Sequence, residues 1–156
     1  MKLRIGQGYD SHSLVENIPF YIGGKCVESS FGAKGHSDGD CLLHAIIDSI
    51  LGALALGDIG TWFPDNDPTL KGIRSTELLK RVLESKELPV FKICNFDCTV
   101  FLDKPKLSPH RELIVTSLAG LLDIDKSVIN LKAKTFEGFG SPKMIAASST
   151  CLIELG

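Results

Sequence analysis

The sequence predicts a single α+β domain in which three helices pack on a mixed β-sheet. Its 156 residues fit one domain. Its content of 44% apolar and 23% charged residues is ordinary for a globular protein with a substantial core. Segments of strand and helix character follow one another in the order β-β-α-α-β-α-β-β, with short connections and no internal repeat. We therefore expect one domain over residues 1–156.

Two strands and a loop are expected before the first helix. Residues 2–11 have the character of a strand, and a second, short strand over residues 18–24 ends at Gly23 and Gly24. Residues 27–40, VESSFGAKGHSDGD, are rich in glycine and serine, which predicts a loop.

The first predicted helix covers residues 41–57, CLLHAIIDSILGALALG. Its apolar residues recur at helical spacing and surround nearly the whole helix, so we expect it to be buried. Ser37 or Asp38 is expected to cap its N-terminus, and Gly57 its C-terminus.

The second half of the chain is predicted to hold two more helices and three more strands. Pro64 and Pro68 interrupt the segment after the first helix, which predicts a loop over residues 58–72. Ser108 is expected to cap the third helix, with Pro109 at its first position. The predicted helices lie within residues 75–88 and 103–124, and the predicted strands at 90–102, 128–136 and 144–155.

Composition and charge argue against several classes of function. The net charge is −2, which provides no electrostatic basis for binding nucleic acid. No run of about 18 apolar residues occurs, so neither a transmembrane helix nor a membrane partner is expected. No signal or transit segment is visible at the N-terminus, so we expect a cytoplasmic protein.

The five cysteines lie in apolar sequence surroundings. Their number is odd, and no C-x-x-C motif occurs. We therefore expect reduced, buried thiols in a cytosolic protein and no zinc site built from cysteine. These residues are Cys26, Cys41, Cys94, Cys98 and Cys151.

Two groups of ionisable residues stand out. Asp10 and His12 lie two apart on the first strand, so their side chains share one face. His44 lies four residues from both Asp40 and Asp48, on one face of the buried helix. Burying such groups is costly unless they are paired or bind a metal. A stripe that faces water and an internal Asp–His–Asp hydrogen-bonded set are the alternatives.

Asp10, His12 and His44 together form a candidate zinc site. Two histidines and one carboxylate are a frequent set of zinc ligands, and they leave a fourth position open for water or substrate. Asp40 or Asp48 is expected to orient His44 through its second ring nitrogen.

Two further segments favour phosphate chemistry. His36 and Ser37 lie near the start of the buried helix, where backbone N–H groups favour an anion. Glu137 follows a predicted strand and precedes the glycine-rich residues 138–142. A carboxylate in this position suits a magnesium ion shared with substrate phosphates, and an exposed turn glutamate is the alternative.

Four segments resemble one enzyme family. The segments GYDSH, HSDGDCLLHAIIDSILGALALGDIG, FPDNDP and KPKLSPHR occur in this order. They are similar to the 2-C-methyl-D-erythritol 2,4-cyclodiphosphate synthases of the non-mevalonate isoprenoid pathway. The resemblance covers nearly the whole chain, and the second and third segments together are highly specific.

The resemblance implies an intramolecular phosphoryl transfer by a phosphorus–oxygen lyase. In the family, the 2-phosphate of 4-diphosphocytidyl-2-C-methyl-D-erythritol 2-phosphate attacks the β-phosphorus, CMP leaves, and the cyclic diphosphate forms. A phosphate nucleophile is already ionised at neutral pH, so the site mainly positions the phosphates and neutralises their charge. The resemblance also implies zinc, with magnesium or manganese, and a homotrimer whose active sites lie between adjacent subunits.

The resemblance assigns roles to residues by position. Asp10, His12 and His44 correspond to the zinc ligands, and Glu137 to the magnesium ligand. His36 and Thr135 correspond to residues that stabilise the transition state. The positions that correspond to substrate contacts are Asp10, His12, His36, Ser37, Asp58, Ile59, Gly60, Phe63, Asp65, Asp67, Leu102, Lys104, Pro105, Lys106, Leu107, Ser108, Lys134, Thr135, Phe136, Glu137 and Lys143.

The chain departs from the family pattern from the end of its fourth predicted strand onward. Lys134 and Phe136 stand where the family usually has threonines, and the segment after Glu137 is about three residues shorter. Lys143 is the nearest counterpart of a family arginine, and a lysine cannot reproduce a bidentate arginine contact. Two other functions therefore stay open. One is a trimeric binding module without catalysis, and the other is a zinc hydrolase that would form a linear product.

Overall fold

The computed structural model describes residues 2–137 and 143–156. Within them, a five-stranded sheet has the order β4-β1-β7-β5-β6, and β2 and β3 form a separate hairpin. Only β5 and β6 run parallel, so the described sheet is mixed. The strands are β1 Lys2–Glu16, β2 Phe20–Ile22, β3 Lys25–Val27, β4 Phe31–Ala33, β5 Phe91–Phe101, β6 Ile129–Lys134 and β7 Met144–Leu155.

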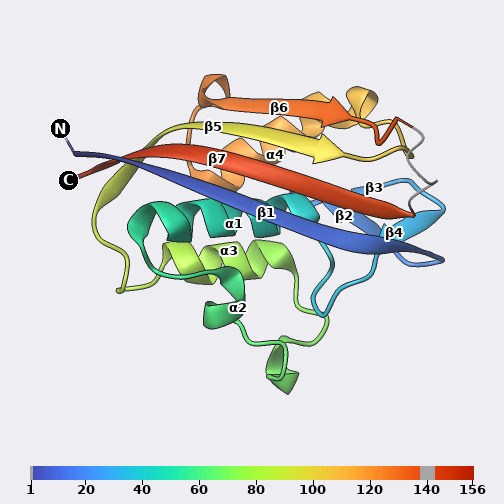
Figure 1. Ribbon diagram of the computed structural model, residues 1–156, viewed down its shortest axis with the longest axis horizontal. Helices are drawn as coiled ribbons and strands as arrows, with labels where there is room; N and C mark the ends of the chain where they lie inside the picture. The colour runs from blue at the N-terminus through green and yellow to red at the C-terminus, as the bar shows by residue number, and fades with distance from the viewer. Residues whose placement is uncertain (1, 138–142) are drawn as a thin grey trace.

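The helices form a second layer against one face of this sheet (Figure 1). α1 packs directly under β1 and β7, while α3 lies beyond α1 and α4 lies against β6. The helices are α1 Cys41–Leu54, α2 Ile59–Trp62, α3 Ser75–Leu83 and α4 Arg111–Leu122. The α+β domain with a mixed sheet that the sequence predicts is confirmed.

Helix α1 is the centre of the core, as its apolar sequence predicts. Eleven of its 14 residues are buried. Its apolar side chains contact the inner face of the sheet on one side and α3 on the other. Because α1 is enclosed in this way, any polar side chain that it carries must find a partner inside the protein.

Two glycines on β1 allow the strand to lie directly on α1. Side chains alternate along β1, and Gly6, Gly8, Asp10 and His12 share the face toward the helix. A Cβ atom at Gly8 would lie 2.0 Å from the carbonyl oxygen of Ala45, well inside contact distance. This close approach brings the polar residues further along β1 to the N-terminal end of α1.

The loops predicted from glycine, serine and proline content contain short elements. β3 and β4 lie wholly or partly within the predicted loop 27–40, and α2 and a 3₁₀ turn at Pro68–Leu70 lie within the predicted loop 58–72. β1 extends to Glu16, beyond its predicted end. The reason is long-range pairing: residues 14–16 of β1 pair with β4, a contact that local composition does not reveal.

The predicted helix caps are wrong in detail. Asp40 caps α1, because its carboxylate accepts a hydrogen bond from the N–H of Leu43 at 3.0 Å. Ala55, in a left-handed conformation, ends α1 before Gly57. Ser108 belongs to a 3₁₀ turn, Ser108–His110, that precedes α4.

The five cysteines are free, as predicted, but two of them are not buried. Cys26 is exposed on β3 and Cys94 is half-buried on β5, beside an irregularity in the pairing of β5 with β7. Burial raises the pKa of the Cys98 thiol to about 11, which keeps this thiol protonated and unreactive at neutral pH.

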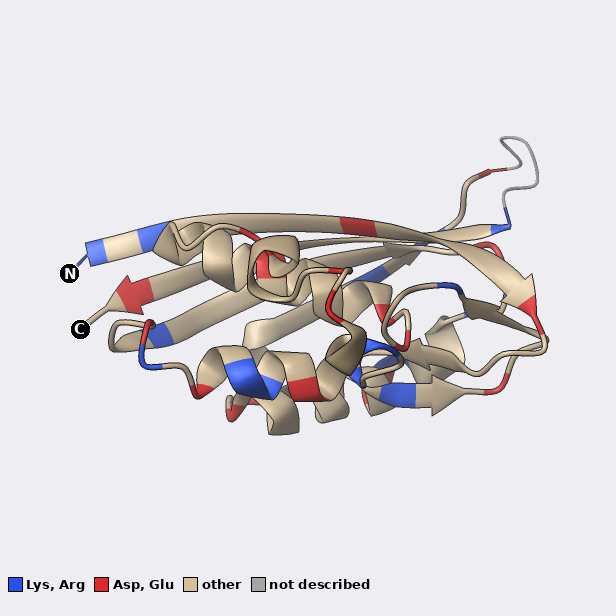
Figure 2. Cartoon of the chain, turned by 90° about the horizontal axis from the view of Figure 1, so that it is seen from below, with Lys and Arg blue, Asp and Glu red and all other residues tan. Residues whose placement is uncertain are grey.

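Lysine and arginine residues are interspersed with aspartate and glutamate residues along the elements (Figure 2). Among residues 2–137 and 143–156, no helix has the length and apolar character needed to span a bilayer.

Candidate active site

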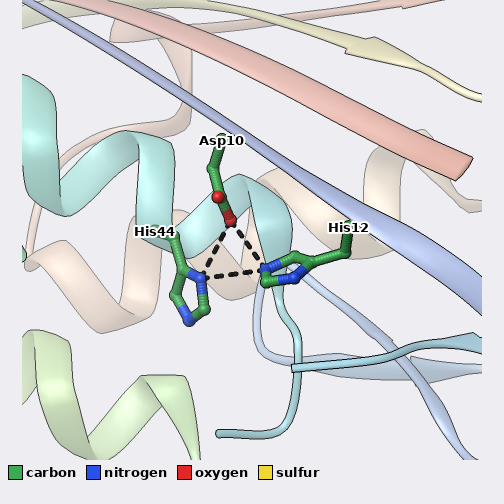
Figure 3. A group of neighbouring side chains, drawn as sticks. All are labelled: Asp10, His12 and His44. Atoms are coloured by element: carbon green, nitrogen blue, oxygen red, sulfur yellow. Dashed lines mark hydrogen bonds and ion pairs between the residues drawn. The ribbon is translucent and has the colours of Figure 1, made fainter. Parts of the chain in front are cut away.

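Asp10, His12 and His44 converge at one point between β1 and α1 (Figure 3). His12 Nε2 lies 2.8 Å from Asp10 Oδ2, and His44 Nδ1 lies 2.9 Å from the same oxygen. The two ring nitrogens are 3.3 Å apart. The sequence-based prediction that these three side chains meet is confirmed.

The remaining ring nitrogens have partners outside this triad. His12 Nδ1 lies 3.0 Å from the carbonyl oxygen of Lys34. His44 Nε2 lies 2.8 Å from Ser75 Oγ and 3.1 Å from Ser37 Oγ. Each imidazole therefore directs one nitrogen into the triad and holds the other in a hydrogen bond, as metal-binding histidines usually do.

Asp40 and Asp48 do not orient His44, contrary to the prediction. The Asp40 carboxylate accepts hydrogen bonds from the backbone N–H groups of Gly23 and Gly24, at 2.9 and 2.7 Å, in addition to its capping bond. Burial raises the pKa of Asp40, and these backbone N–H groups act against that rise. Asp48 Oδ1 accepts the N–H of Ile59 at 2.7 Å and so holds the start of α2.

Burial and hydrogen bonding oppose each other at the triad. Burial by itself would raise the pKa of Asp10, but hydrogen bonds from His12 and His44 hold that pKa well below its usual value. Burial would lower the pKa of His12, and the Asp10 carboxylate instead raises it. Asp10 is therefore ionised across the physiological pH range, which is the form that binds a metal.

The triad fits a divalent metal ion. Its three donor atoms lie within 4.8 Å of one another, and two of them are imidazole nitrogens while the third is a carboxylate oxygen. This donor set is typical of zinc and related first-row ions in sites that keep one position open.

A cavity of about 360 Å³ opens beside the triad and collects many of the predicted site residues. His36 lies on its wall, and His36 Nε2 is buried without a hydrogen-bond partner among the described residues. A buried ring nitrogen without a partner on a cavity wall is suited to binding a polar ligand. The lining residues are Asp10, His12, Gly35, His36, Ser37, His44, Ile59, Gly60, Phe63, Asp65, Leu70, Ile73 and Leu78.

Asp58 and Asp67 support this cavity from outside its wall. Asp58 caps α2 through the N–H of Thr61 at 2.8 Å, and Asp67 caps the 3₁₀ turn through the N–H of Thr69 at 2.9 Å. Hydrogen bonds from these threonines lower the pKa of both carboxyl groups. The two aspartates therefore shape the loops that carry Ile59, Gly60 and Asp65.

A second group of predicted residues lies at a separate groove of about 690 Å³. Lys104, Pro105 and Lys106 line it together with residues 28–31. Leu102 and Leu107 are buried in the core and are not among the residues that line the groove. Ser108 is exposed at the start of the 3₁₀ turn.

The predicted site residues at the end of β6 and after it also lie away from the triad's cavity. Thr135 Oγ1 is hydrogen-bonded to the Glu137 carboxylate, and the N–H of Phe136 donates to Asp103 at 2.8 Å. Lys134 is exposed at the end of β6, and Lys143 Nζ lies 3.9 Å from Glu16. The intervening residues 138–142 lie outside the described residues.

Sequence reasoning missed several residues of the site. Ser75, the first residue of α3, reaches the His44 ring, and Asp38, in the loop before α1, is hydrogen-bonded to Ser75. Leu70, Ile73 and Leu78 belong to the apolar part of the cavity wall. Leu70 and Leu78 have the apolar pattern of ordinary core residues, so no local signal distinguishes them.

The fold and the triad define an α+β protein with a candidate metal site on the wall of a cavity. The chain belongs to the YgbB family, whose family model matches residues 3–154. It is 50% identical over 154 residues to 2-C-methyl-D-erythritol 2,4-cyclodiphosphate synthase of Clostridium acetobutylicum, with 97% of this chain and 99% of the relative covered. Identity to the Aquifex aeolicus synthase of the same name is 47% over 153 residues, with 98% of each chain covered.

A solved structure of 2C-methyl-D-erythritol-2,4-cyclodiphosphate synthase in a CDP-bound form has the same fold. It matches with a TM-score of 0.86 and 41% identity, and the match covers 97% of this chain and 100% of that one. The family resemblance and the enzyme class predicted from the sequence are therefore confirmed.

Proposed function

We propose that this enzyme converts 4-diphosphocytidyl-2-C-methyl-D-erythritol 2-phosphate into 2-C-methyl-D-erythritol 2,4-cyclodiphosphate and CMP. This step belongs to non-mevalonate isoprenoid precursor biosynthesis, and one domain over residues 1–156 performs it. The observation that carries the proposal is the joint position of the triad, His36 and Ser37 on one cavity wall, in a chain 50% identical to a synthase of this name.

The reaction forms one P–O bond and breaks another. An oxygen of the 2-phosphate attacks the β-phosphorus, and the bond from that phosphorus to the bridging oxygen of CMP breaks. Asp10, His12 and His44 would hold zinc, which would supply a Lewis acid for the phosphates. His36 and Ser37 bind phosphate oxygens beside the triad, and His36 stabilises charge in the transition state.

The loop around α2 holds the erythritol part of the substrate. Ile59 and Gly60 line the cavity, and Asp48 and Asp58 keep this loop in place. Asp58 also accepts hydrogen bonds from erythritol hydroxyls. Phe63, Asp65 and Asp67 belong to the adjoining substrate loop, in which Phe63 and Asp65 line the cavity. Positioning is the main contribution of these residues, because the phosphate nucleophile is already charged.

The residues proposed for cytidine and for a second metal lie outside this cavity within one chain. Glu137 would hold magnesium or manganese, with Thr135 beside it. Residues 102–108 bind cytosine, and Lys134, Phe136 and Lys143 contact the diphosphate. A homotrimer with active sites between subunits accounts for this separation, because a neighbouring copy then supplies the second group. An exposed apolar face supports the proposal: Leu3, Ile5 and Tyr9 on β1 are 45%, 72% and 56% exposed on the side of the sheet away from α1.

The enzyme acts on a small molecule in the cytoplasm and has neither nucleic acid nor membrane as a partner. The net charge of −2 and the interspersed charges in Figure 2 support this part of the proposal.

Phosphorus NMR tests the proposed reaction directly. The purified protein is incubated with the substrate, zinc and magnesium, and we expect signals of a cyclic diphosphate together with CMP. A linear diphosphate product would instead identify a hydrolase that places water at the metal. Absence of any reaction, with CDP still bound, would identify a binding module and implicate the divergent residues 134–143.

A further inference from the structure

We propose that Ser75 and Asp38 form a buried hydrogen-bond relay that positions the metal ligand His44. The relay runs from His44 Nε2 to Ser75 Oγ, at 2.8 Å, and from Ser75 Oγ to Asp38 Oδ1, at 2.5 Å. The proposal rests on the metal site of the proposed function, but it concerns residues that neither the family resemblance nor the sequence motifs assign to that site.

The chemistry of the three groups gives the relay one direction. If His44 binds a metal through Nδ1, the nitrogen that faces Asp10 and His12, the proton of the neutral ring must be on Nε2. Nε2–H then donates to Ser75 Oγ. The serine hydroxyl has one hydrogen, and it donates that hydrogen to the Asp38 carboxylate, which in its ionised form only accepts. The relay therefore selects the ring tautomer in which Nδ1 is free for the metal.

Asp38 is itself held rigidly. Its side chain is only 4% exposed. Asp38 Oδ2 accepts the N–H of Ser75 at 3.1 Å and the Arg74 Nε–H at 2.8 Å, while Oδ1 also accepts the N–H of Asp40 at 3.2 Å. The Arg74 guanidinium lies 4.0 Å from the centre of the Tyr21 ring, which fixes the arginine as well. A carboxylate with so many donors around it has little freedom to release the serine.

Ser37 is the other hydroxyl near His44 Nε2, and its geometry is weaker. Its Oγ lies 3.1 Å from Nε2, its side chain is half-buried, and it lines the cavity where a ligand competes for it. Ser75, in contrast, is fully buried at the first position of α3. The described partners of the Ser75 hydroxyl are the His44 ring and Asp38.

Metal affinity of Ser75→Ala tests the relay without reference to turnover. Zinc affinity is measured by competition with a chromophoric chelator, and folding is checked by circular dichroism. Loss of a hydrogen-bond partner behind a metal ligand commonly weakens affinity about 10- to 100-fold, and we expect a change in that range. Cobalt substituted for zinc should also show an altered visible spectrum, because the His44 ring is free to tilt.

Ser49→Ala is the matched control. Ser49 is equally buried, and its hydroxyl is hydrogen-bonded to the Ile46 carbonyl at 2.8 Å and to Ser149 at 3.0 Å, away from the triad. We expect its zinc affinity to change less than about twofold, since no ligand of the triad is touched. A folded Ser75→Ala protein with parental zinc affinity and a parental cobalt spectrum would overturn the relay.

Nitrogen NMR of the zinc-loaded parent protein provides a test that needs no variant. We expect the His44 ring to show zinc on Nδ1 and a slowly exchanging hydrogen on Nε2. Zinc on Nε2 would overturn the relay even if Ser75→Ala failed to fold. Failure of the relay leaves the parent protein with zinc and turnover, whereas a parent protein that binds no zinc would overturn the metal site of the proposed function together with the relay.

Discussion

Asp10 shows how the site works at the scale of single residues. Its carboxylate is partly buried, a position that favours the neutral form, yet two imidazoles hydrogen-bond to it and keep it ionised. The same contacts raise the pKa of His12. Without a metal, the triad therefore contains an ion pair between Asp10 and His12, and the strength of this pair depends on pH.

The metal-free protein should have a pH window in which Asp10 stabilises it. The lowered pKa of Asp10 means that its contribution is present above the ordinary aspartate value of 3.8 and is lost on acidification below it. The raised pKa of His12 means that its contribution is present below the ordinary value of 6.5 and is lost as pH rises through the raised one.

Urea unfolding of the parent and of Asp10→Asn in EDTA, from pH 3 to 9, checks this window. Between these two pH limits we expect the parent to be more stable than Asp10→Asn by about 2 kcal/mol, the value for a hydrogen bond to a charged group. The difference should be smaller below the lower limit and above the upper one. A stability difference that keeps growing above pH 8 would contradict the ion pair.

His44→Ala should remove zinc and turnover together. Two ligands would remain, and we expect zinc affinity and activity each to fall by about 100-fold or more, beyond the usual loss for a residue behind a ligand. Metal analysis after dialysis and the phosphorus NMR assay measure the two effects. His110→Ala, a histidine outside the cavity, should keep stoichiometric zinc. Full zinc content in His44→Ala would refute its role as a ligand.

At the scale of secondary structure elements, the close packing of β1 on α1 positions the triad. Asp10 and His12 come from the strand and His44 comes from the helix, so their meeting depends on the distance between these elements (Figure 3). That distance is short because Gly6 and Gly8 carry no side chain where the helix backbone approaches.

Gly8→Ala should push β1 away from α1. The new Cβ would lie 2.0 Å from the carbonyl oxygen of Ala45 and 2.8 Å from the N atom of Ser49, and neither backbone atom can rotate away. We expect the free energy of unfolding to fall by about 3 kcal/mol, at the upper end of typical overpacking, and zinc affinity to fall with it.

Gly52→Ala is the control for this packing argument, since it adds the same methyl group to α1. There the nearest atom to a new Cβ is the carbonyl oxygen of Gln7, at an ordinary 3.8 Å. We expect unchanged or slightly higher stability, by up to about 1 kcal/mol, because alanine is the better helix former. Equal denaturation curves for the two variants would show that the close approach at Gly8 is unimportant.

At the scale of the whole molecule, helices cover one face of the sheet (Figure 1). The other face carries the exposed apolar side chains of β1. The proposed site residues also divide into two groups, one around the triad and one around the groove at residues 104–106. Both features agree with the proposed assembly of several copies.

Ile5→Asp should separate the subunits. A charge at this exposed apolar position on β1 cannot be buried against another copy without a large desolvation cost. We expect a folded monomer that still binds zinc but has lost turnover. Light scattering with gel filtration measures the mass, and the phosphorus NMR assay measures turnover. Leu113→Asp, an exposed apolar position on α4, should keep the parental mass. A parental mass for Ile5→Asp would argue against this face as the interface.

Much of the fold was predictable because its signals are local. The period of the apolar residues predicts α1 and its burial, and the last strand was predicted with the bounds Met144–Leu155 that it has in the structure. β4 and the end of β1 were not predicted, because they form by pairing with each other across 17 or so residues of chain. The position of Asp40 as the cap of α1 likewise depends on backbone groups of Gly23 and Gly24 in another segment.

The sequence by itself determined the fold class, the family and the three residues of the triad. These depend on local periodicity and on motifs whose residues lie close together in the chain. Only the tertiary structure decided which groups stand behind His44, because Ser75 and Asp38 are 31 and 6 residues from it and meet it only when α3 packs beside α1. It also decided that Glu137 and residues 104–106 lie apart from the triad's cavity, since the order of strands in a sheet is a long-range property that no short motif encodes.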